Sequence, residues 1–170
     1  KPLILWMPTF IKIESERVKN IKLWASSVNN LLKNYHVIIR PHPKTVVTDP
    51  EIVEYLKNLK LSVDLNISRK LIELYEIADL VLSDYGSSVL SSIYMEKKII
   101  LLNLPQNSEY VKKILDMEYV EVLARNDIES INFDNRDALL SSVEKLFLVN
   151  DLAERKKIKA KYFGDKSGNT

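Results

Sequence analysis

The stretch Leu80-Val81-Leu82-Ser83-Asp84-Tyr85-Gly86-Ser87-Ser88 decides the fold of this chain. It opens with consecutive aliphatic residues, a pattern typical of a parallel strand that helices cover on both faces. Gly86 permits a tight turn after the strand, and apolar residues then return at helical spacing from Val89 to Ile93. The stretch therefore predicts a strand, a turn and a helix, which is the repeating unit of an α/β sheet.

The same alternation continues in both directions along the chain. Strands are predicted at Leu3–Met7, Val37–Arg40, Leu61–Leu65, Leu80–Ser83, Ile99–Leu102 and Val120–Leu123. Helices are predicted at residues 18–32, Glu51–Asn58, Ser68–Ile77, Ser88–Met95, Glu109–Met117 and Asn135–Val149, with a last basic helix after Asp151, whose side chain caps it together with Glu154. This order predicts a single α/β domain over residues 1–170, with a doubly wound, mainly parallel Rossmann-like sheet of about six strands and helices on both faces.

Composition narrows the function classes. The 170 residues are 46% hydrophobic and 28% charged, which is ordinary for a globular protein. The 25 Lys and Arg against 23 Asp and Glu are too balanced to favour a nucleic-acid partner. Absence of cysteine excludes disulfides, thiolate metal sites and thiol nucleophiles. With 3 glycines the chain has neither a GxGxxG nor a P-loop motif, so we expect no cofactor and no metal.

The expected location is the cytoplasm. No apolar run approaches the roughly 20 residues that cross a bilayer, and no signal peptide is visible. The basic run from Arg155 to Lys161 is more often a solvated helix face, and the alternative is a peripheral contact with anionic lipid at the inner face of the plasma membrane. Because the chain begins at Lys1 immediately before a strand, we expect it to be one domain of a longer protein.

In doubly wound sheets the ligand lies beyond the carboxyl ends of the strands, so ligand-binding residues are expected directly after the predicted strands. The first strand ends in Pro8-Thr9-Phe10, which leaves the Thr9 hydroxyl in a loop. The second ends in Arg40-Pro41-His42-Pro43-Lys44, where two prolines hold Arg40 and His42 extended. Arginine suits phosphate oxygens and histidine can donate a proton or a hydrogen bond, whereas His36, at the start of that strand, is interpreted as structural.

The fourth strand ends in the Asp84-Tyr85-Gly86-Ser87-Ser88 turn. A helix start of this kind binds phosphate readily, although Ser87 alone would be an ordinary N-cap. Because this turn shares an edge with Arg40 and His42, phosphate binding is the preferred interpretation. Near the end of the chain, residues 163–168 predict either a second anion-binding turn, with Lys166 and Ser167, or the start of a disordered tail.

Together the three strand-end motifs resemble the C-terminal half of the CDP-glycerol glycerophosphotransferase family, whose members build or prime teichoic acids and related capsular polymers. The motifs are Leu5-Trp6-Met7-Pro8-Thr9-Phe10, Arg40-Pro41-His42-Pro43 and Ser83-Asp84-Tyr85-Gly86-Ser87-Ser88. The resemblance implies an enzyme of GT-B architecture, of which this chain is the donor-binding domain. It implies that His42 assists departure of CMP and that Gly86 and Ser87 contact phosphate. The implied partners are a CDP-linked donor, an N-terminal acceptor domain of the same protein and a polymer acceptor.

The resemblance and the strand-end reasoning together give one catalytic candidate, His42, and a set of donor- or phosphate-binding candidates: Thr9, Arg40, Lys44, Asp84, Gly86, Ser87, Ser88, Lys166 and Ser167. A second histidine of the family, the implied base for the acceptor hydroxyl, belongs to the N-terminal half, so this chain alone is expected to bind donor without transferring it.

The chain departs from the family pattern in ways that leave the donor open. Ile11 stands where the family has arginine, Gly86 replaces a serine, and Ser91 replaces an aspartate. Two alternatives therefore stay beside the transfer of glycerol or ribitol phosphate. One is a GT-B glycosyltransferase or epimerase-like domain that uses a UDP-sugar, and the other is a non-catalytic α/β binding module.

Overall fold

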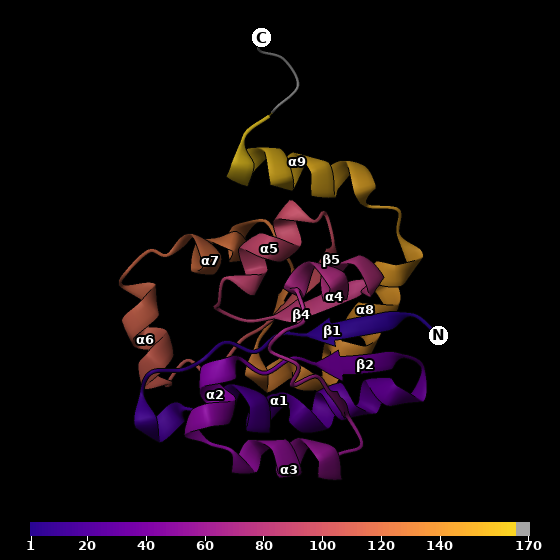
Figure 1. Cartoon of the computed structure of the whole chain (residues 1–170). Coiled ribbons are helices and arrows are strands. Elements are labelled where there is room, and N and C mark those ends of the chain that lie inside the picture. Colours follow the sequence, from indigo (N-terminus) through magenta and orange to yellow (C-terminus); the bar gives the residue numbers. More distant parts are fainter. Residues whose placement is uncertain (166–170) are drawn as a thin grey trace.

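A six-stranded parallel sheet forms the centre of the molecule (Figure 1). The computed structural model describes residues 1–165. Its strands are β1 (Leu3–Trp6), β2 (His36–Ile39), β3 (Ser62–Val63), β4 (Leu80–Ser83), β5 (Lys98–Leu102) and β6 (Ser130–Ile131). They lie in the order β3-β2-β1-β4-β5-β6, so the direction of winding reverses between β1 and β4. This confirms the predicted doubly wound sheet and places its switch point beside β1.

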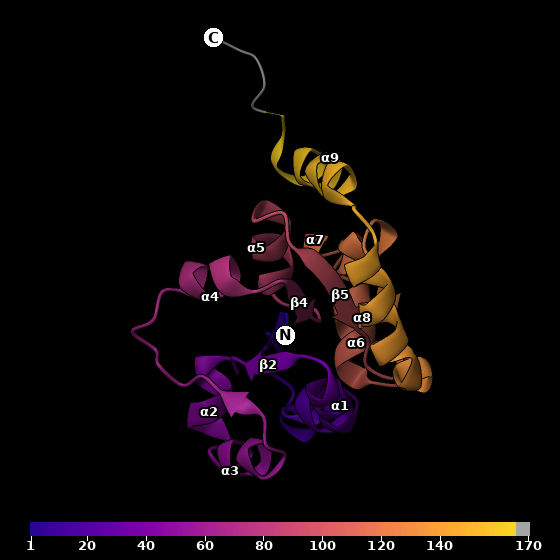
Figure 2. The same cartoon turned by 90° about the vertical axis from the view of Figure 1, so that its right-hand side faces the viewer.

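Helices cover both faces of the sheet (Figure 2). They are α1 (Lys19–Asn30), α2 (Pro43–Thr48), α3 (Glu51–Asn58), α4 (Leu71–Ile77), α5 (Ser88–Tyr94), α6 (Glu109–Leu115), α7 (Val120–Leu123), α8 (Leu139–Leu148) and α9 (Leu152–Phe163). On one face α1, α3 and α8 pack around Trp6 and Trp24, both almost fully buried. On the other, α4 packs on β1 and β4, and α5 packs on β4 and β5 with α9 lying across it.

The apolar runs explain this layering. Along β1 and the residue that follows it, Ile4 and Trp6 pack into one core and Leu5 and Met7 pack into the other, as alternation along an extended chain requires. Such strands have no solvent face, which is why they are apolar throughout. A third cluster joins Ile11 and Tyr85 to α6 and α7 beyond the carboxyl ends of the strands.

The predicted strand at Val120–Leu123 is wrong, because these residues form α7 and the sixth strand is Ser130–Ile131. The backbone N–H groups of Val122 and Leu123 both donate to the Tyr119 carbonyl, which closes a helical turn. Val120 and Leu123 each stay about half exposed, so the apolar run does not mark a buried strand. A strand of two residues at the sheet edge carries too little pattern to be found in advance.

Two details of the helices also differ from expectation. The six-residue helix α2 was not predicted, because its start at Pro43 was interpreted as a stiff loop. Helix α9 begins after Asp151 as predicted, but the Asp151 side chain does not cap it. That carboxylate instead accepts hydrogen bonds from Lys98 Nζ at 2.8 Å and from Arg155 Nε at 2.9 Å.

Candidate functional site

A pocket of about 320 Å³ lies where the carboxyl ends of β1, β2 and β4 meet, at the switch point of the sheet. Residues from all three strand-end motifs line it: Thr9, Arg40, His42, Gly86, Ser87 and Ser88. These residues are up to 79 positions apart in the chain, and the parallel sheet brings them to one edge. The geometry thus unites six of the candidate residues in one cavity.

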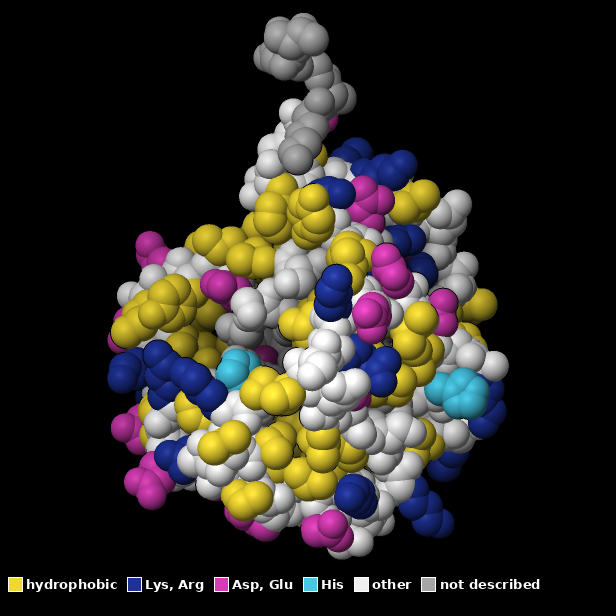
Figure 3. Space-filling view, viewed as in Figure 1, with side chains coloured by type: hydrophobic (Ala, Val, Ile, Leu, Met, Phe, Trp, Pro, Cys, Tyr) yellow, Lys and Arg dark blue, Asp and Glu magenta, His cyan; other side chains and the backbone are white. Residues whose placement is uncertain are grey.

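The two histidines occupy different surroundings. His42 lines the pocket, whereas His36 begins β2 and therefore lies at the opposite, amino edge of the sheet. Both side chains are exposed, and Figure 3 shows them in separate places on one face of the molecule.

The His42 ring is oriented by the backbone two residues further along the chain. It is the N-cap of α2, and its Nδ1 accepts a hydrogen bond from the Lys44 backbone N–H at 3.1 Å. Because Nδ1 acts as acceptor, the neutral ring carries its proton on Nε2. Burial, together with the nearby Lys44 charge, lowers the pKa of His42 below its ordinary value. The Phe10 ring lies 5.9 Å away, centroid to centroid. At neutral pH this arrangement offers a ligand a neutral N–H donor.

The β1 and β4 loops approach each other so closely that position 86 must be glycine. A Cβ atom on Gly86 would lie 2.6 Å from Thr9 Oγ1 and 2.8 Å from Thr9 Cβ. Both distances are shorter than van der Waals contact, and Thr9 Cβ cannot move without its backbone. The glycine that departs from the family motif is therefore explained by the packing of the pocket wall.

The serines after Gly86 have different roles. Ser87 is the N-cap of α5, but its side chain makes no capping hydrogen bond and is exposed at the pocket. Ser88 Oγ pairs with Ser83 Oγ and lies 3.3 Å from the Met7 carbonyl, so it ties β4 to β1. Ser91, which stands in place of the family's aspartate, also lines the pocket.

Asp84 does not line the pocket but anchors its wall. Its buried carboxylate accepts hydrogen bonds from the backbone N–H of Thr9 (3.1 Å), from Asn20 Nδ2 (2.9 Å) and from the backbone N–H of Tyr85. Burial raises the pKa of Asp84, and these hydrogen bonds and the Arg125 charge oppose that rise. Asp84 thus joins the β1 loop, α1 and the β4 loop, and gives Thr9 and Gly86 a fixed separation.

The pocket has a second arginine, Arg69, that the sequence did not predict. Arg69, in the loop between β3 and α4, lines the cavity together with Arg40, and both contact Asp64. Burial works to raise the pKa of Asp64, but the Asn66 N–H and the two arginines hold it below its ordinary value. Tyr75 also lines the pocket. Its buried hydroxyl has no partner of standard hydrogen-bond geometry within residues 1–165, although Ser91 and Ser92 lie near it.

The remaining candidates lie elsewhere. Lys44 is exposed and does not line the pocket. Ile11, where the family has arginine, is fully buried against Tyr85 and Leu104. Lys166 and Ser167 lie outside the described residues. Over the part of the chain that the structure describes, no group of three metal-ligating side chains and no helix able to span a membrane is found.

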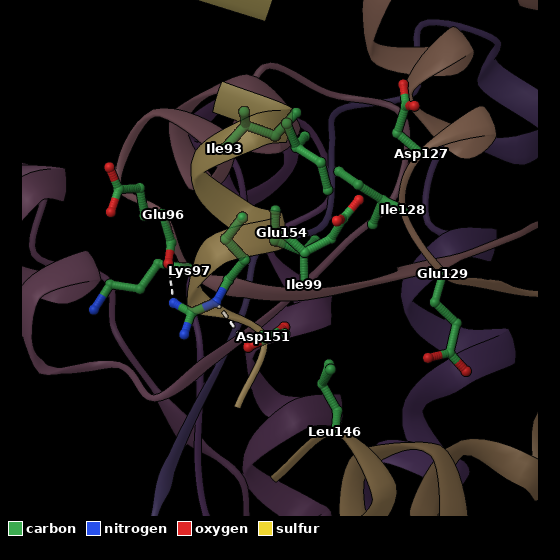
Figure 4. Close-up of a pocket in the computed structure, with 12 residues that line it drawn as sticks. Ile93, Glu96, Lys97, Ile99, Asp127, Ile128, Glu129, Leu146, Asp151 and Glu154 are labelled. Atoms are coloured by element: carbon green, nitrogen blue, oxygen red, sulfur yellow. Dashed lines mark hydrogen bonds and ion pairs between the residues drawn. The ribbon is translucent and has the colours of Figure 1, made fainter. Parts of the chain in front are cut away.

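A second pocket, of about 170 Å³, lies between α5, α9 and the start of β5 (Figure 4). It is lined by several charged side chains, among them Asp151 and Arg155. Arg155 donates to Asp151 and to the Glu96 carbonyl. Figure 4 labels both acceptors and marks the contacts with dashed lines. The bond to Glu96 fastens α9 to the turn before β5, and the bond from Lys98 to Asp151 fastens it to β5 itself.

Comparison with solved structures agrees with this architecture. A glycosyltransferase from Rickettsia africae superimposes with a TM-score of 0.63 at 19% identity, over 93% of this chain and 41% of that one. The wall teichoic acid polymerase TagF gives a TM-score of 0.61 at 17% identity, over 95% and 38%. A trehalose-6-phosphate synthase gives 0.59 at 13% identity, over 94% and 40%.

These similarities show the fold: the chain has the Rossmann-like α/β architecture found in these glycosyltransferases. It spans about two-fifths of the length of each of the three. The sequence matches no protein-family model and no curated protein.

Proposed function

We propose that this chain is the donor-binding domain of a GT-B transferase and that the pocket at the ends of β1, β2 and β4 binds the diphosphate of a nucleotide-activated donor. The observation that carries the proposal is the convergence of Thr9, His42 and Ser87 in one cavity at the switch point of the sheet. Phosphate oxygens accept hydrogen bonds from hydroxyl groups, imidazole N–H groups and cationic side chains, and the cavity contains all three kinds of donor.

The leading donor is a CDP-linked alcohol such as glycerol or ribitol. The likeness of the three motifs to the glycerophosphotransferase family favours it, and the TagF superposition is compatible with it. In the proposed reaction an acceptor hydroxyl attacks the phosphorus that bears the alcohol, the bond from that phosphorus to the bridging oxygen breaks, and CMP leaves. His42 Nε2–H would donate a hydrogen bond to the departing phosphate while the pocket cations offset its charge.

The acceptor side of the reaction belongs to the proposed remainder of the protein. A partner domain would supply the base that takes the proton from the acceptor hydroxyl and would hold the polymer. The chain described here would therefore bind donor and leave it intact unless that domain is present.

A UDP-sugar is the second candidate donor. The observation in its favour is that glycosyltransferases superimpose on the chain as well as TagF does. Both donors carry a diphosphate, so the same pocket serves either hypothesis, and the nucleotide base distinguishes them.

Calorimetric titration of the chain with CMP, CDP-glycerol, CDP-ribitol and UDP-sugars tests the proposal. We expect binding with a preference for cytidine nucleotides, and loss of that binding in His42→Ala. His36→Ala is the matched control, because it removes an exposed histidine at the other edge of the sheet. A preference for uridine would favour the second candidate. Absence of binding to any of these ligands would favour a non-catalytic module and refute the proposal.

A further inference from the structure

The two arginines of the pocket share one carboxylate but are not equivalent. Arg40 Nη1 lies 2.7 Å from Asp64 Oδ2 and 2.7 Å from the Asn66 carbonyl oxygen, and its side chain is only 7% exposed. Its backbone N–H donates to the Trp6 carbonyl at 2.9 Å. Arg40 is therefore enclosed at the end of β2, where it holds the loop after β3 against the sheet.

Arg69 contacts the same carboxylate through its Nε atom. Its Nε lies 3.2 Å from Asp64 Oδ2, and the side chain is 40% exposed. Within residues 1–165 its two terminal nitrogens have no hydrogen-bond partner. The ion pair at Nε holds the guanidinium beside Asp64 and leaves its outer pair of N–H groups for a ligand. Two parallel N–H groups are the arrangement that phosphate oxygens bind in a bidentate manner.

The loop that carries Arg69 is braced by its own polar side chains. Asp64 Oδ1 accepts from the Asn66 N–H at 3.1 Å, and Asn66 Oδ1 accepts from the Ser68 N–H at 3.1 Å. The Arg69 N–H then donates to the Asn66 carbonyl at 3.0 Å. Successive turns of this kind restrict the loop before a ligand arrives, so little ordering cost is added on binding.

We propose that Arg69 is the residue that binds the diphosphate of the donor, and that Arg40 is a structural residue that holds the Asp64 loop in place. The inference rests on the proposed function of this pocket. Of the lysines and arginines in the described residues, Arg40 and Arg69 line the cavity and no other does. Arg40 is nearly enclosed and its Nη1 is held by Asp64 and Asn66, whereas the Arg69 side chain is 40% exposed, so Arg69 is the cation that the pocket presents most openly to a ligand.

The test compares Arg69→Gln with Lys70→Gln, which removes the same charge from an exposed neighbour that does not line the pocket. The probes are CDP, UDP and inorganic pyrophosphate, titrated calorimetrically at two salt concentrations. We expect Arg69→Gln to weaken binding of CDP and pyrophosphate by about tenfold to a hundredfold and to reduce the salt dependence, because a charge-assisted phosphate contact is lost. Arg69→Lys should recover part of the affinity, and the urea midpoint of Arg69→Gln should stay at that of the parent protein.

Arg40→Gln should show the opposite profile, with a lowered urea midpoint and faster amide exchange at residues 64–66. Equal binding by Arg69→Gln and the parent protein, or equal weakening by Lys70→Gln, would overturn the inference and leave the proposed function standing. Binding of pyrophosphate that depends on Arg69, without binding of either nucleotide, would support the inference and refute the nucleotide donor. Absence of binding to all three probes by the parent protein would refute both.

Discussion

The pocket at the ends of β1, β2 and β4 (the strand-end pocket) and the pocket beside α9 (the α9 pocket) each adjoin an aspartate that is shared by two cations. In the first, Asp64 pairs with Arg40 and Arg69. In the second, Asp151 pairs with Lys98 and Arg155. Both clusters therefore have one carboxylate and two cations, but they differ in how many N–H donors remain without a partner in the chain.

Around Asp151 the chain itself uses all three N–H groups of Lys98 and two of the three nitrogens of Arg155. Lys98 Nζ donates to the Leu146 and Val149 carbonyls at 2.7 and 2.8 Å and to Asp151, so all its N–H groups have partners. Arg155 likewise reaches the Glu96 carbonyl. Around Asp64 the outer edge of Arg69 faces the cavity. The difference teaches that charge in a pocket indicates a ligand only where the donors are not already satisfied within the fold.

The largest effect on stability is expected from breaking the cluster of Asp151, Lys98 and Arg155 at the start of α9, here called the α9 cluster. Asp151→Ala leaves Lys98 and Arg155, 14% and 22% exposed, without their common carboxylate. Loss of one partner from such a mostly buried cluster should lower the free energy of unfolding by about 3 kcal/mol, measured by urea denaturation, while nucleotide affinity stays unchanged. Glu154→Ala removes the same charge from an exposed position of the same pocket and should change stability by less than about 0.5 kcal/mol. Equal losses in the two variants would show that the cluster does not fasten α9.

The next effect concerns the wall of the strand-end pocket. Gly86→Ala places a methyl group against Thr9 Oγ1 and Cβ, so the two loops must separate. Overpacking of this kind costs about 1–3 kcal/mol, and we expect nucleotide affinity to fall with it. The control is the double variant Thr9→Gly/Gly86→Ala, which opens the space again. It should be more stable than the sum of the two single changes predicts. Simple additivity would place the cost of Gly86→Ala elsewhere.

The layers of this fold could be predicted because each central strand is apolar on both faces. The runs at β1, β2, β4 and β5 were found nearly to the residue. The strand at the β6 edge of the sheet could not be predicted in the same way. Val120–Leu123 has apolar residues at three of its four positions, as a strand could, but its backbone hydrogen bonds to Tyr119 make it helix α7, and Val120 and Leu123 are about half exposed. The two residues of β6 carry no periodic signal at all.

The pocket was predictable to the extent that strand ends define it. Thr9, His42 and Ser87 were expected at one edge because each follows the carboxyl end of a predicted parallel strand, and they line one cavity. A strand was predicted at Leu61–Leu65, around the observed β3, but Arg69 was missed because no motif marks the loop that follows it. The proposed role of Arg69 depends on its contact with Asp64, and Asp64 is in turn held by Arg40, 24 positions away in the sequence. Such a pairing is formed only by the tertiary structure. The roles of these residues toward a ligand stay predictions.

A smaller effect is expected from substitutions that test the roles of the two His42 ring nitrogens separately. His42→Gln keeps an N–H donor near the position of Nε2, whereas His42→Asn keeps an acceptor near Nδ1 for the Lys44 N–H. We expect the Gln variant to bind CDP within about threefold of the parent protein and to lose about 0.5–1 kcal/mol of stability with its cap. The Asn variant should keep its stability and lose about tenfold in affinity. The reverse pattern would show that Nδ1, not Nε2, serves the ligand.

The smallest effect is a pH dependence that only the strand-end pocket should produce. Because the pKa of His42 in the folded chain lies below its ordinary value of 6.5, a proton binds the unfolded chain more readily than the folded one. The stability from this residue is complete above pH 6.5 and is lost as the pH falls through 6.5 and then through the folded-state pKa. The imidazole faces Lys44, whose charge and backbone N–H both oppose protonation at Nδ1. Urea midpoints measured at pH 7.5, 6.5 and 5.5 should therefore fall more steeply for the parent protein than for His42→Asn, which retains the cap and cannot titrate. Parallel slopes would mean that His42 keeps its ordinary pKa in the folded chain and that burial and Lys44 do not lower it.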